Sequence, residues 1–219
     1  MTRSSRMLMT LVLAVVLSIA GALPAFAATV GLWHMDESSG QMVDSSGSGN
    51  HGTLQNVTRV SPGYNGSGRA YSFNGTNSRV IIGNASSLNP GSKTITITAH
   101  VKFTSRPSAS VGDYDLVRKG SGIYKMEIFG SGQGYCYFKG TSGSLSVKAG
   151  PDLSDGRWHT IVCKKTSSSI TLTVDGSSTS KSGSVGSISS SAPLILGGKP
   201  NASGDWYKGV MDEVSISIV

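Results

Sequence analysis

The carboxylates of this chain are few and widely spaced, which limits the acid–base chemistry that the sequence can support. Glycoside hydrolysis needs two carboxyl groups that flank the same bond. Beyond residue 27 the only glutamates are Glu37, Glu127 and Glu213. Asp212 adjoins Glu213, but adjacent strand residues point to opposite faces of a sheet, and Glu127 is the one carboxylate of its predicted strand. The sequence therefore predicts no catalytic residue and predicts that the protein is not an enzyme.

Four histidines are dispersed through the chain, at positions 34, 51, 100 and 159. A Ser–His–Asp triad is a spatial arrangement that spacing does not exclude, but the sequence contains no G-x-S-x-G turn of the kind that presents a nucleophilic serine. His100 is the one candidate base, because it lies on the polar face of the predicted strand 94–103. An exposed or hydrogen-bonded histidine without catalytic function is the favoured interpretation.

Trp206 and Tyr207 are the best candidates for an exposed aromatic platform, because they follow a polar, glycine-containing loop (Asn201–Asp205). Tyr114 is the second candidate, since aspartates and basic residues, Lys119 among them, surround it with hydrogen-bonding groups. Aromatic side chains with a few convergent polar groups are typical of ligand sites. We therefore predict that Trp206, Tyr207, Tyr114 and Lys119 form the ligand-binding surface.

Asp212 is the most unusual single residue. It lies in an alternating segment, 210–218, whose other inward positions are valine and isoleucine. An unpaired buried charge is very costly, so the sequence predicts compensation at Asp212. A bound cation, backbone N–H donors, or an arginine such as Arg69 or Arg79 can each supply it.

Cys136 and Cys163 are the two cysteines of the chain, and both lie in strand-like stretches. An even cysteine count in an exported protein favours a disulfide. We predict that the two residues lie on neighbouring strands and form one. Neither has a second cysteine or a histidine at metal-ligand spacing, so no zinc site is expected.

The charge of the chain is positive but scattered. The formal net charge is +7, and it becomes 17 − 12 = +5 when Arg3 and Arg6 are removed with the first 27 residues. A nucleic-acid-binding protein usually gathers its basic residues in one cluster, and this sequence has no such cluster. We therefore predict no nucleic-acid partner and interpret the charge as solubilising, with a mild attraction to acidic glycans as the alternative.

The first 27 residues have the pattern of an export signal. Arg3 and Arg6 precede an almost wholly apolar run, Met7–Ala22, which ends before Ala25-Phe26-Ala27. This order of a positive region, an apolar region and an A-x-A site predicts a signal-peptide helix over 1–27, cleaved before Ala28. We expect a secreted, extracellular monomer that consists of one domain, 28–219, and that has no stable membrane insertion after cleavage.

The elements that must position these residues are short strands. In the segment 94–103, Ile95 and every second residue after it are apolar, while the intervening residues are polar. A second alternating segment, 170–174, is followed by Asp175-Gly176, a hairpin turn signal, and then by a returning strand, 177–181. The chain also contains 29 glycines. Short alternating strands with such turns predict an all-β, antiparallel jelly-roll β-sandwich.

Three phrases carry a family resemblance: GLWHMDESSGQMVDSSGSGNHG (Gly31–Gly52), DGRWHTIV (Asp155–Val162) and GVMDEVSIS (Gly209–Ser217). They resemble the laminin-G-like group of concanavalin A-like jelly-roll domains over nearly all of the chain after its export segment. The resemblance implies the same sandwich fold. It constrains function weakly, because this scaffold carries lectins, adhesion modules, glycosidases and lyases.

The resemblance also implies a structural calcium ion, because similar domains often hold one near their paired terminal strands. Calcium prefers hard oxygen ligands. Asp212 is the first expected ligand, and Asp36, Asp44 and Asn74 are the further expected oxygen donors because they lie in or near the shared phrases.

The function predicted from these features is that of a secreted, non-catalytic binding module for a glycan or a cell-surface polymer. One alternative is a small secreted glycan-degrading enzyme of the same fold, either a glycoside hydrolase or a polysaccharide lyase with His100 as its base. A further alternative is an adhesion module that binds another protein.

Overall fold

The computed structural model describes residues 27–201 and 203–219. The predicted signal peptide falls on residues 1–27, so all of it except Ala27 lies outside the described residues. Within the described residues, no helix is long and apolar enough to cross a membrane. The one helical element there is a short 3₁₀ turn, η1 (Ser86–Leu88).

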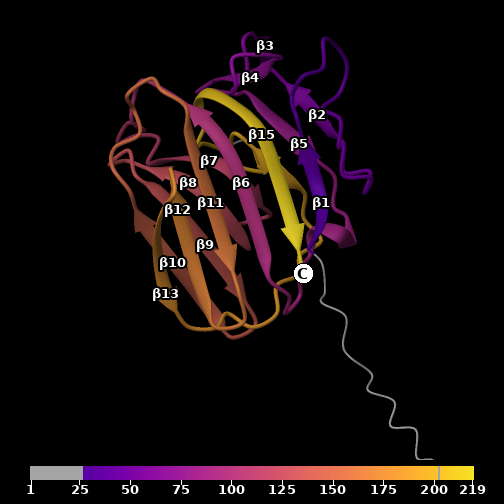
Figure 1. The fold of residues 1–219 in the computed structure, drawn as a ribbon, viewed down its shortest axis with the longest axis vertical. Coiled ribbons are helices and arrows are strands. Elements are labelled where there is room, and N and C mark those ends of the chain that lie inside the picture. Colours follow the sequence, from indigo (N-terminus) through magenta and orange to yellow (C-terminus); the bar gives the residue numbers. More distant parts are fainter. Residues whose placement is uncertain (1–26, 202) are drawn as a thin grey trace, which may run out of the picture.

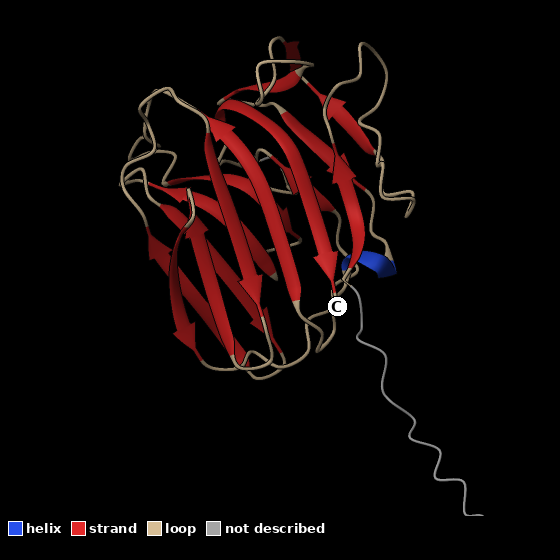
Figure 2. Cartoon of the chain, in the orientation of Figure 1, coloured by secondary structure: helices blue, strands red, loops and turns tan. Residues whose placement is uncertain are grey.

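Two antiparallel sheets pack face to face with the core between them (Figures 1 and 2), which confirms the predicted all-β sandwich. The first sheet has the order β13-β12-β11-β6-β15-β4-β3, with β1 also paired to β15. Its strands are β1 (Ala28–Trp33), β3 (Thr58–Val60), β4 (Ala70–Asn74), β6 (Ile95–Lys102), β11 (His159–Lys165), β12 (Ser169–Val174), β13 (Ser177–Ser182) and β15 (Lys208–Ile218).

The second sheet has the order β10-β9-β8-β7-β14-β5-β2. Its strands are β2 (Gly52–Gln55), β5 (Arg79–Ile82), β7 (Asp113–Lys119), β8 (Tyr124–Phe129), β9 (Gly134–Gly140), β10 (Gly143–Ala149) and β14 (Leu194–Leu196). In Figure 1 this sheet lies behind the first one. The first and last strands of the fold, β1 and β15, pair directly with each other.

The segments with the clearest alternation in the sequence form strands, as predicted. Buried and partly exposed residues alternate along the whole of β6, as the two-residue repeat of a strand with one face on the core requires. β12 and β13 form the predicted hairpin. Asp175 and Gly176 connect them with φ values of 47° and 84°, which are the positive values that a two-residue hairpin turn needs.

Cys136 of β9 and Cys163 of β11 form the predicted disulfide, with their Cα atoms 5.6 Å apart. The pairing is confirmed, but the expectation of neighbouring strands is corrected. β9 belongs to the second sheet and β11 to the first, so the bond crosses the core and joins the two sheets.

The predicted inward row of the segment 210–218 is wrong at its start. β15 contains a bulge between Asp212 and Ser215, and Glu213 adopts a φ of 47°. Met211 and Val214 therefore both face the core, and Asp212 pairs with His100 on the opposite, outer face of the sheet. A bulge inserts one extra residue, which reverses the alternation.

Candidate functional site

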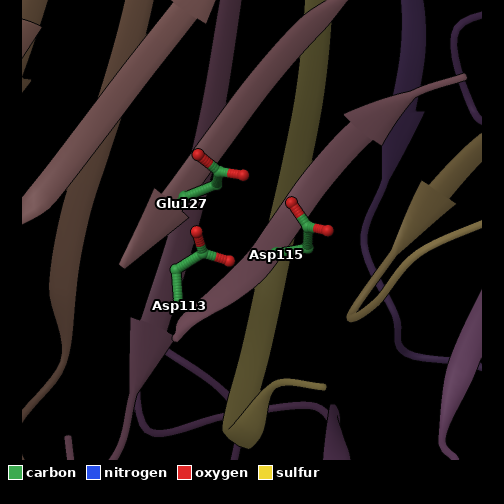
Figure 3. Close-up of side chains that lie close together, drawn as sticks. All are labelled: Asp113, Asp115 and Glu127. Carbon is green, nitrogen blue, oxygen red and sulfur yellow. The ribbon is translucent and has the colours of Figure 1, made fainter. Parts of the chain in front are cut away.

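Three carboxylates converge on the outer face of the second sheet. Tyr114 of β7 and Met126 of β8 are part of the core, so the alternating residues Asp113, Asp115 and Glu127 face outward. Glu127 lies directly opposite Asp115 in the β7–β8 pairing. The three side chains can each place one oxygen within 4.8 Å of the others (Figure 3). We call these residues the carboxylate cluster.

Basic side chains surround the carboxylate cluster. A bulge in β7 between Asp115 and Val117 returns Arg118 to the outer face, where its Nη1 lies 2.8 Å from Asp115 Oδ2 and 3.7 Å from Glu127 Oε1. Lys125 Nζ lies 2.5 Å from Glu127 Oε1. Asp115 and Glu127 are completely buried, so these ion pairs are shielded from solvent.

The loop that leads from β14 into β15 is tied to the cluster. Asp205 Oδ2 lies 3.6 Å from Arg118 Nη1 and 2.7 Å from Lys199 Nζ. The backbone N–H of Asp115 donates a hydrogen bond of 2.9 Å to the carbonyl oxygen of Asp205. These contacts hold the loop, through Asp205, against β7.

The pKa values of two carboxyl groups of the cluster, Asp113 and Asp115, are raised. Burial, together with the charge of Glu127, raises the pKa of Asp113 to about 7. Burial, together with the charge of Glu127, raises the pKa of Asp115 well above its usual range, although Arg118 opposes that shift. Carboxylates that share one site cannot all ionise easily.

Sequence reasoning missed this cluster. Glu127 is indeed the one carboxylate of its strand, but its partners come from the neighbouring strand β7. The available signal was the D-x-D spacing of Asp113 and Asp115, which places two carboxylates on one face. The cross-strand register, which brings Glu127 opposite Asp115, was not readable from the sequence.

Two adjoining pockets lie beside the carboxylate cluster. One, of about 370 Å³, is lined by Arg118, Lys199 and the chain around Pro200. The other, of about 320 Å³, is lined by Lys125, Tyr135, Tyr137 and Lys139. Ser121 lines both. We call them the paired pockets. Lys125 Nζ lies 5.9 Å from the ring centroid of Tyr135 and 5.4 Å from that of Tyr137.

The predicted ligand surface of Trp206, Tyr207, Tyr114 and Lys119 is not formed. Tyr207 is fully buried and donates hydrogen bonds to the carbonyl oxygens of Lys102 and Val210. Tyr114 is 4% exposed and packs edge-on against Tyr207. Tyr114 lies at an inward position of β7, and Tyr207 enters the core from the loop just before β15.

Lys119 and Trp206 are also positioned by structural contacts. Lys119 is buried, and its Nζ donates to Asn84 Oδ1 and to the carbonyl oxygen of Ala192. Trp206 is half-buried and lies against Gly198, where a Cβ atom would come within 2.7 Å of the ring. Of the four predicted residues, only Trp206 retains a partly exposed ring.

Backbone amides meet the charge of Asp212. Its Oδ2 accepts a hydrogen bond of 2.7 Å from the N–H of Tyr64, and its Oδ1 accepts one of 3.0 Å from the N–H of Glu213. Burial nevertheless raises the pKa of Asp212 to about 6, and the charges of Glu213 and Asp36 add to the effect. Of the predicted arginines, Arg79 is bonded elsewhere, to Gln55 and to backbone carbonyls of the Lys199-Pro200 segment.

The oxygens around Asp212 fit a hard cation. Asp212 Oδ2 and the carbonyl oxygens of Ser67 and Arg69 lie within 2.7 Å of the position that a Cβ atom would take at Gly63. Asp36 Oδ1 accepts a hydrogen bond of 2.6 Å from the N–H of Arg69 on the same loop. Carboxylate and carbonyl oxygens are the ligands that calcium prefers. The residues present near Asp36 and Asp212 therefore suit the expected ion.

The side-chain oxygens of Asp44 and Asn74, the other two expected calcium ligands, accept hydrogen bonds from backbone N–H groups. Asp44 accepts hydrogen bonds from the backbone N–H groups of Leu32, Ser46 and Asn50. Asn74 Oδ1 accepts from three successive N–H groups, over residues 76–78. Asn74 closes a local turn, and Asp44 also ties Leu32 of β1 to its loop. The calcium role of these two residues stays a prediction.

His100, the candidate base of the lyase alternative, lies under an aromatic cover. The ring of Tyr64 stacks on it with centroids 3.8 Å apart, and Trp158 meets Tyr64 edge-on at 5.7 Å. The Nδ1 atom of His100 lies 3.0 Å from the hydroxyl oxygen of Thr160. Burial lowers the pKa of His100, so the ring is neutral at physiological pH.

Solved structures with this fold include several binding domains. The binding domain of Paraclostridial Mosquitocidal Protein 1 is 18% identical, with a TM-score of 0.68, over 86% of this chain and 48% of that chain. The chain thus spans about half the length of that structure. Mouse laminin alpha1 domains LG4-5 match with 21% identity and a TM-score of 0.53, over 67% and 40%. Similarities at this level show the fold alone.

Domain 4 of AbnA, a GH43 extracellular arabinanase from Geobacillus stearothermophilus, matches over nearly its whole length. It is 15% identical, with a TM-score of 0.61, over 88% of this chain and 93% of that chain, and its structure was solved in complex with arabinotriose. No curated protein matches the chain in sequence.

A family model described as the concanavalin A-like lectin/glucanases superfamily matches residues 74–217. The match covers well over half of the chain and contains the last two of the three resembling phrases. The chain therefore belongs to the laminin-G-like group of the concanavalin A-like lectin/glucanase superfamily.

Proposed function

We propose that the chain is an exported, non-catalytic module that binds a glycan or a cell-surface polymer through the paired pockets. The observation that carries the proposal is the pair of partly exposed tyrosines, Tyr135 and Tyr137, beside Lys125 and Lys139 in one pocket. Aromatic rings offer apolar faces to sugar rings, and a few charged groups fix orientation. Arg118 and Lys199 continue the lining into the second pocket but are paired with carboxylates, so the exposed Lys139 of the first pocket is the group that favours an acidic glycan.

Two similar structures support a sugar as the ligand class. Domain 4 of AbnA was solved with arabinotriose. The binding domain of Botulinum Neurotoxin DC, which is 10% identical over 86% of this chain and has a TM-score of 0.62, was solved with SialylT. Both are distant relatives, so they support a class of ligand and no particular sugar.

The surroundings of the carboxylate cluster argue against hydrolysis. Asp115 and Glu127 are completely buried, each lies in an ion pair with a basic residue, and neither lines the paired pockets. A general acid must come within hydrogen-bond reach of the bond it protonates. We therefore assign the carboxylates a role beneath the binding surface.

A glycan panel tests this proposal. The domain 28–219 is screened for binding to neutral and acidic polysaccharides, and the same mixtures are assayed for reducing ends and unsaturated sugars. We expect retention of acidic glycans without release of either product. Product release that Glu127→Gln abolishes would instead establish the glycan-degrading alternative. Retention on a protein partner, with no glycan bound, would establish the adhesion alternative.

Calcium at Asp36 and Asp212 completes the proposed module as a structural element. When bound, calcium would supply a positive partner for the Asp212 carboxylate, which otherwise accepts hydrogen bonds from backbone N–H groups. The same proposal includes export by cleavage before Ala28 and a monomeric domain, 28–219. N-terminal sequencing of protein from the culture supernatant checks the cleavage, and an N-terminus other than Ala28 would contradict it.

A further inference from the structure

We propose that Asp113, Asp115 and Glu127 form a second divalent-cation site, suited to calcium, on the outer face of the second sheet. This site is separate from the one near Asp212, because its ligands come from β7 and β8 of the other sheet. Figure 3 shows the three carboxyl groups directed into a common space from two adjacent strands.

The first argument is that buried carboxylate oxygens in this space lack a donor. Among the described residues, Asp113 Oδ1, Asp115 Oδ1 and both carboxylate oxygens of Glu127 are buried and accept no hydrogen bond. Asp115 and Glu127 are themselves completely buried. Buried polar atoms are nearly always satisfied, and an exception calls for an unseen water or ion.

The second argument is that one oxygen of each of the two buried carboxylates is held in place by a basic residue. Arg118 holds Asp115 Oδ2 at 2.8 Å, and Lys125 holds Glu127 Oε1 at 2.5 Å. Each basic residue therefore fixes its carboxylate through an ion pair to one oxygen, and the other oxygen has no hydrogen-bond donor. Outer partners of this kind commonly orient the ligands of a metal site.

The third argument is the balance of charge. Asp205 joins the three carboxylates, and Arg118, Lys125 and Lys199 are the three cations that pair with this group. When all four carboxyl groups are ionised, their four negative charges exceed the three positive charges by one. A divalent cation removes the repulsion among all three cluster carboxylates, whereas a shared proton joins only two of them.

The chemistry of the ligands identifies the class of metal. All three are carboxylates, with neither sulfur nor imidazole, which suits calcium, magnesium or manganese and disfavours zinc and copper. Calcium–oxygen distances of about 2.3–2.6 Å allow ligand oxygens to lie up to about 5 Å apart, and the cluster oxygens lie within 4.8 Å of one another. Asp113 is partly exposed, so the ion enters from its side and retains water there.

Manganese binding, measured by electron paramagnetic resonance, tests the site directly. Manganese is a spectroscopic probe for hard oxygen sites. The experiment uses the domain 28–219 with Asp36→Asn, which weakens the other candidate site without altering the cluster. We expect this protein to bind one manganese ion. Adding Asp113→Asn should weaken that binding at least tenfold. Adding Asp152→Asn instead, a matched control at a surface carboxylate, should leave the binding unchanged.

Two results would overturn the proposal. One is that the Asp36→Asn protein binds no manganese and that calcium does not raise its melting temperature. The other is that Asp113→Asn leaves the affinity unaltered. In either case the cluster holds only a shared proton. The first measurement keeps the cluster intact, so it does not depend on the folding of a cluster variant. It uses no glycan, so its outcome is also independent of the proposed ligand.

Discussion

At the scale of single residues, Asp115 and Asp212 show two ways of burying a carboxylate. Asp115 is paired with Arg118 at 2.8 Å, whereas Asp212 accepts hydrogen bonds from the backbone N–H groups of Tyr64 and Glu213. Different partners offset the lost hydration of the two carboxyl groups, so Asp115 and Asp212 should respond differently to mutation and to pH.

Arg118→Ala should destabilise the protein strongly. The change leaves Asp115 and Glu127 buried beside each other without their shared cation, and breaking a buried ion pair from one side costs about 3–5 kcal/mol. Urea unfolding measures the loss. Arg157→Ala, at a largely exposed arginine, is the control and should cost less than about 0.5 kcal/mol. Equal effects of the two changes would show that Arg118 does not stabilise the cluster.

The pH dependence at Asp212 has a definite sign. Burial raises its folded-state pKa from 3.8 to about 6, so the folded state binds the proton more tightly than the unfolded state does. The contribution of Asp212 to stability is therefore greatest below about pH 4 and is lost as the pH rises through about 6.

In EDTA, the difference in unfolding free energy between wild type and Asp212→Asn should fall by roughly 1–3 kcal/mol between pH 4 and pH 7. Comparing the two proteins removes the contributions of the other carboxylates. Saturating calcium should oppose the fall, because the ion binds the ionised group. A difference that rises over this range would contradict the assigned pKa.

At the scale of elements, the sequence predicted the strands better than their pairing. The alternation of β6 and the Asp175-Gly176 turn were visible because each depends on local geometry. The bulge at Glu213 and the register that sets Glu127 opposite Asp115 depend on contacts with distant strands. The bulge placed Asp212 on the face opposite to the predicted one, and the calcium site at Asp212 and Asp36 stays a prediction. The ligand surface predicted at Tyr207 and Tyr114 failed because both rings fill the core.

The disulfide is the element-scale feature with the clearest consequence. It closes a loop with a sequence separation of 27 and joins β9 to β11 across the core. On the chain-entropy estimate, such a loop contributes about 3–4 kcal/mol. The double change Cys136→Ala and Cys163→Ala should lower the unfolding free energy by at least that amount, as urea unfolding would measure. Reduction of the wild type should reproduce most of the loss. A loss below about 1 kcal/mol would mean that the core alone fixes the two sheets.

At the scale of the whole molecule, the two candidate cation sites and the paired pockets belong to different parts of the sandwich. The Asp212 site lies on the outer face of the first sheet, beneath the loop that carries Tyr64. The carboxylate cluster and the paired pockets share the outer face of the second sheet, where Arg118 lines a pocket and also contacts the cluster. Ligand binding should therefore depend on the second sheet and be largely independent of Asp212.

Calorimetric titration of the best-retained acidic oligosaccharide tests the central claim most directly. Wild type, Tyr137→Ala and Lys181→Ala are compared, the last being a control on the fully exposed strand β13 of the other sheet. We predict that Tyr137→Ala weakens binding by about 1–3 kcal/mol, as expected for the loss of a stacking ring, and that Lys181→Ala leaves the affinity unaltered. Binding that is unchanged by Tyr137→Ala would contradict the assignment of the paired pockets as the glycan site.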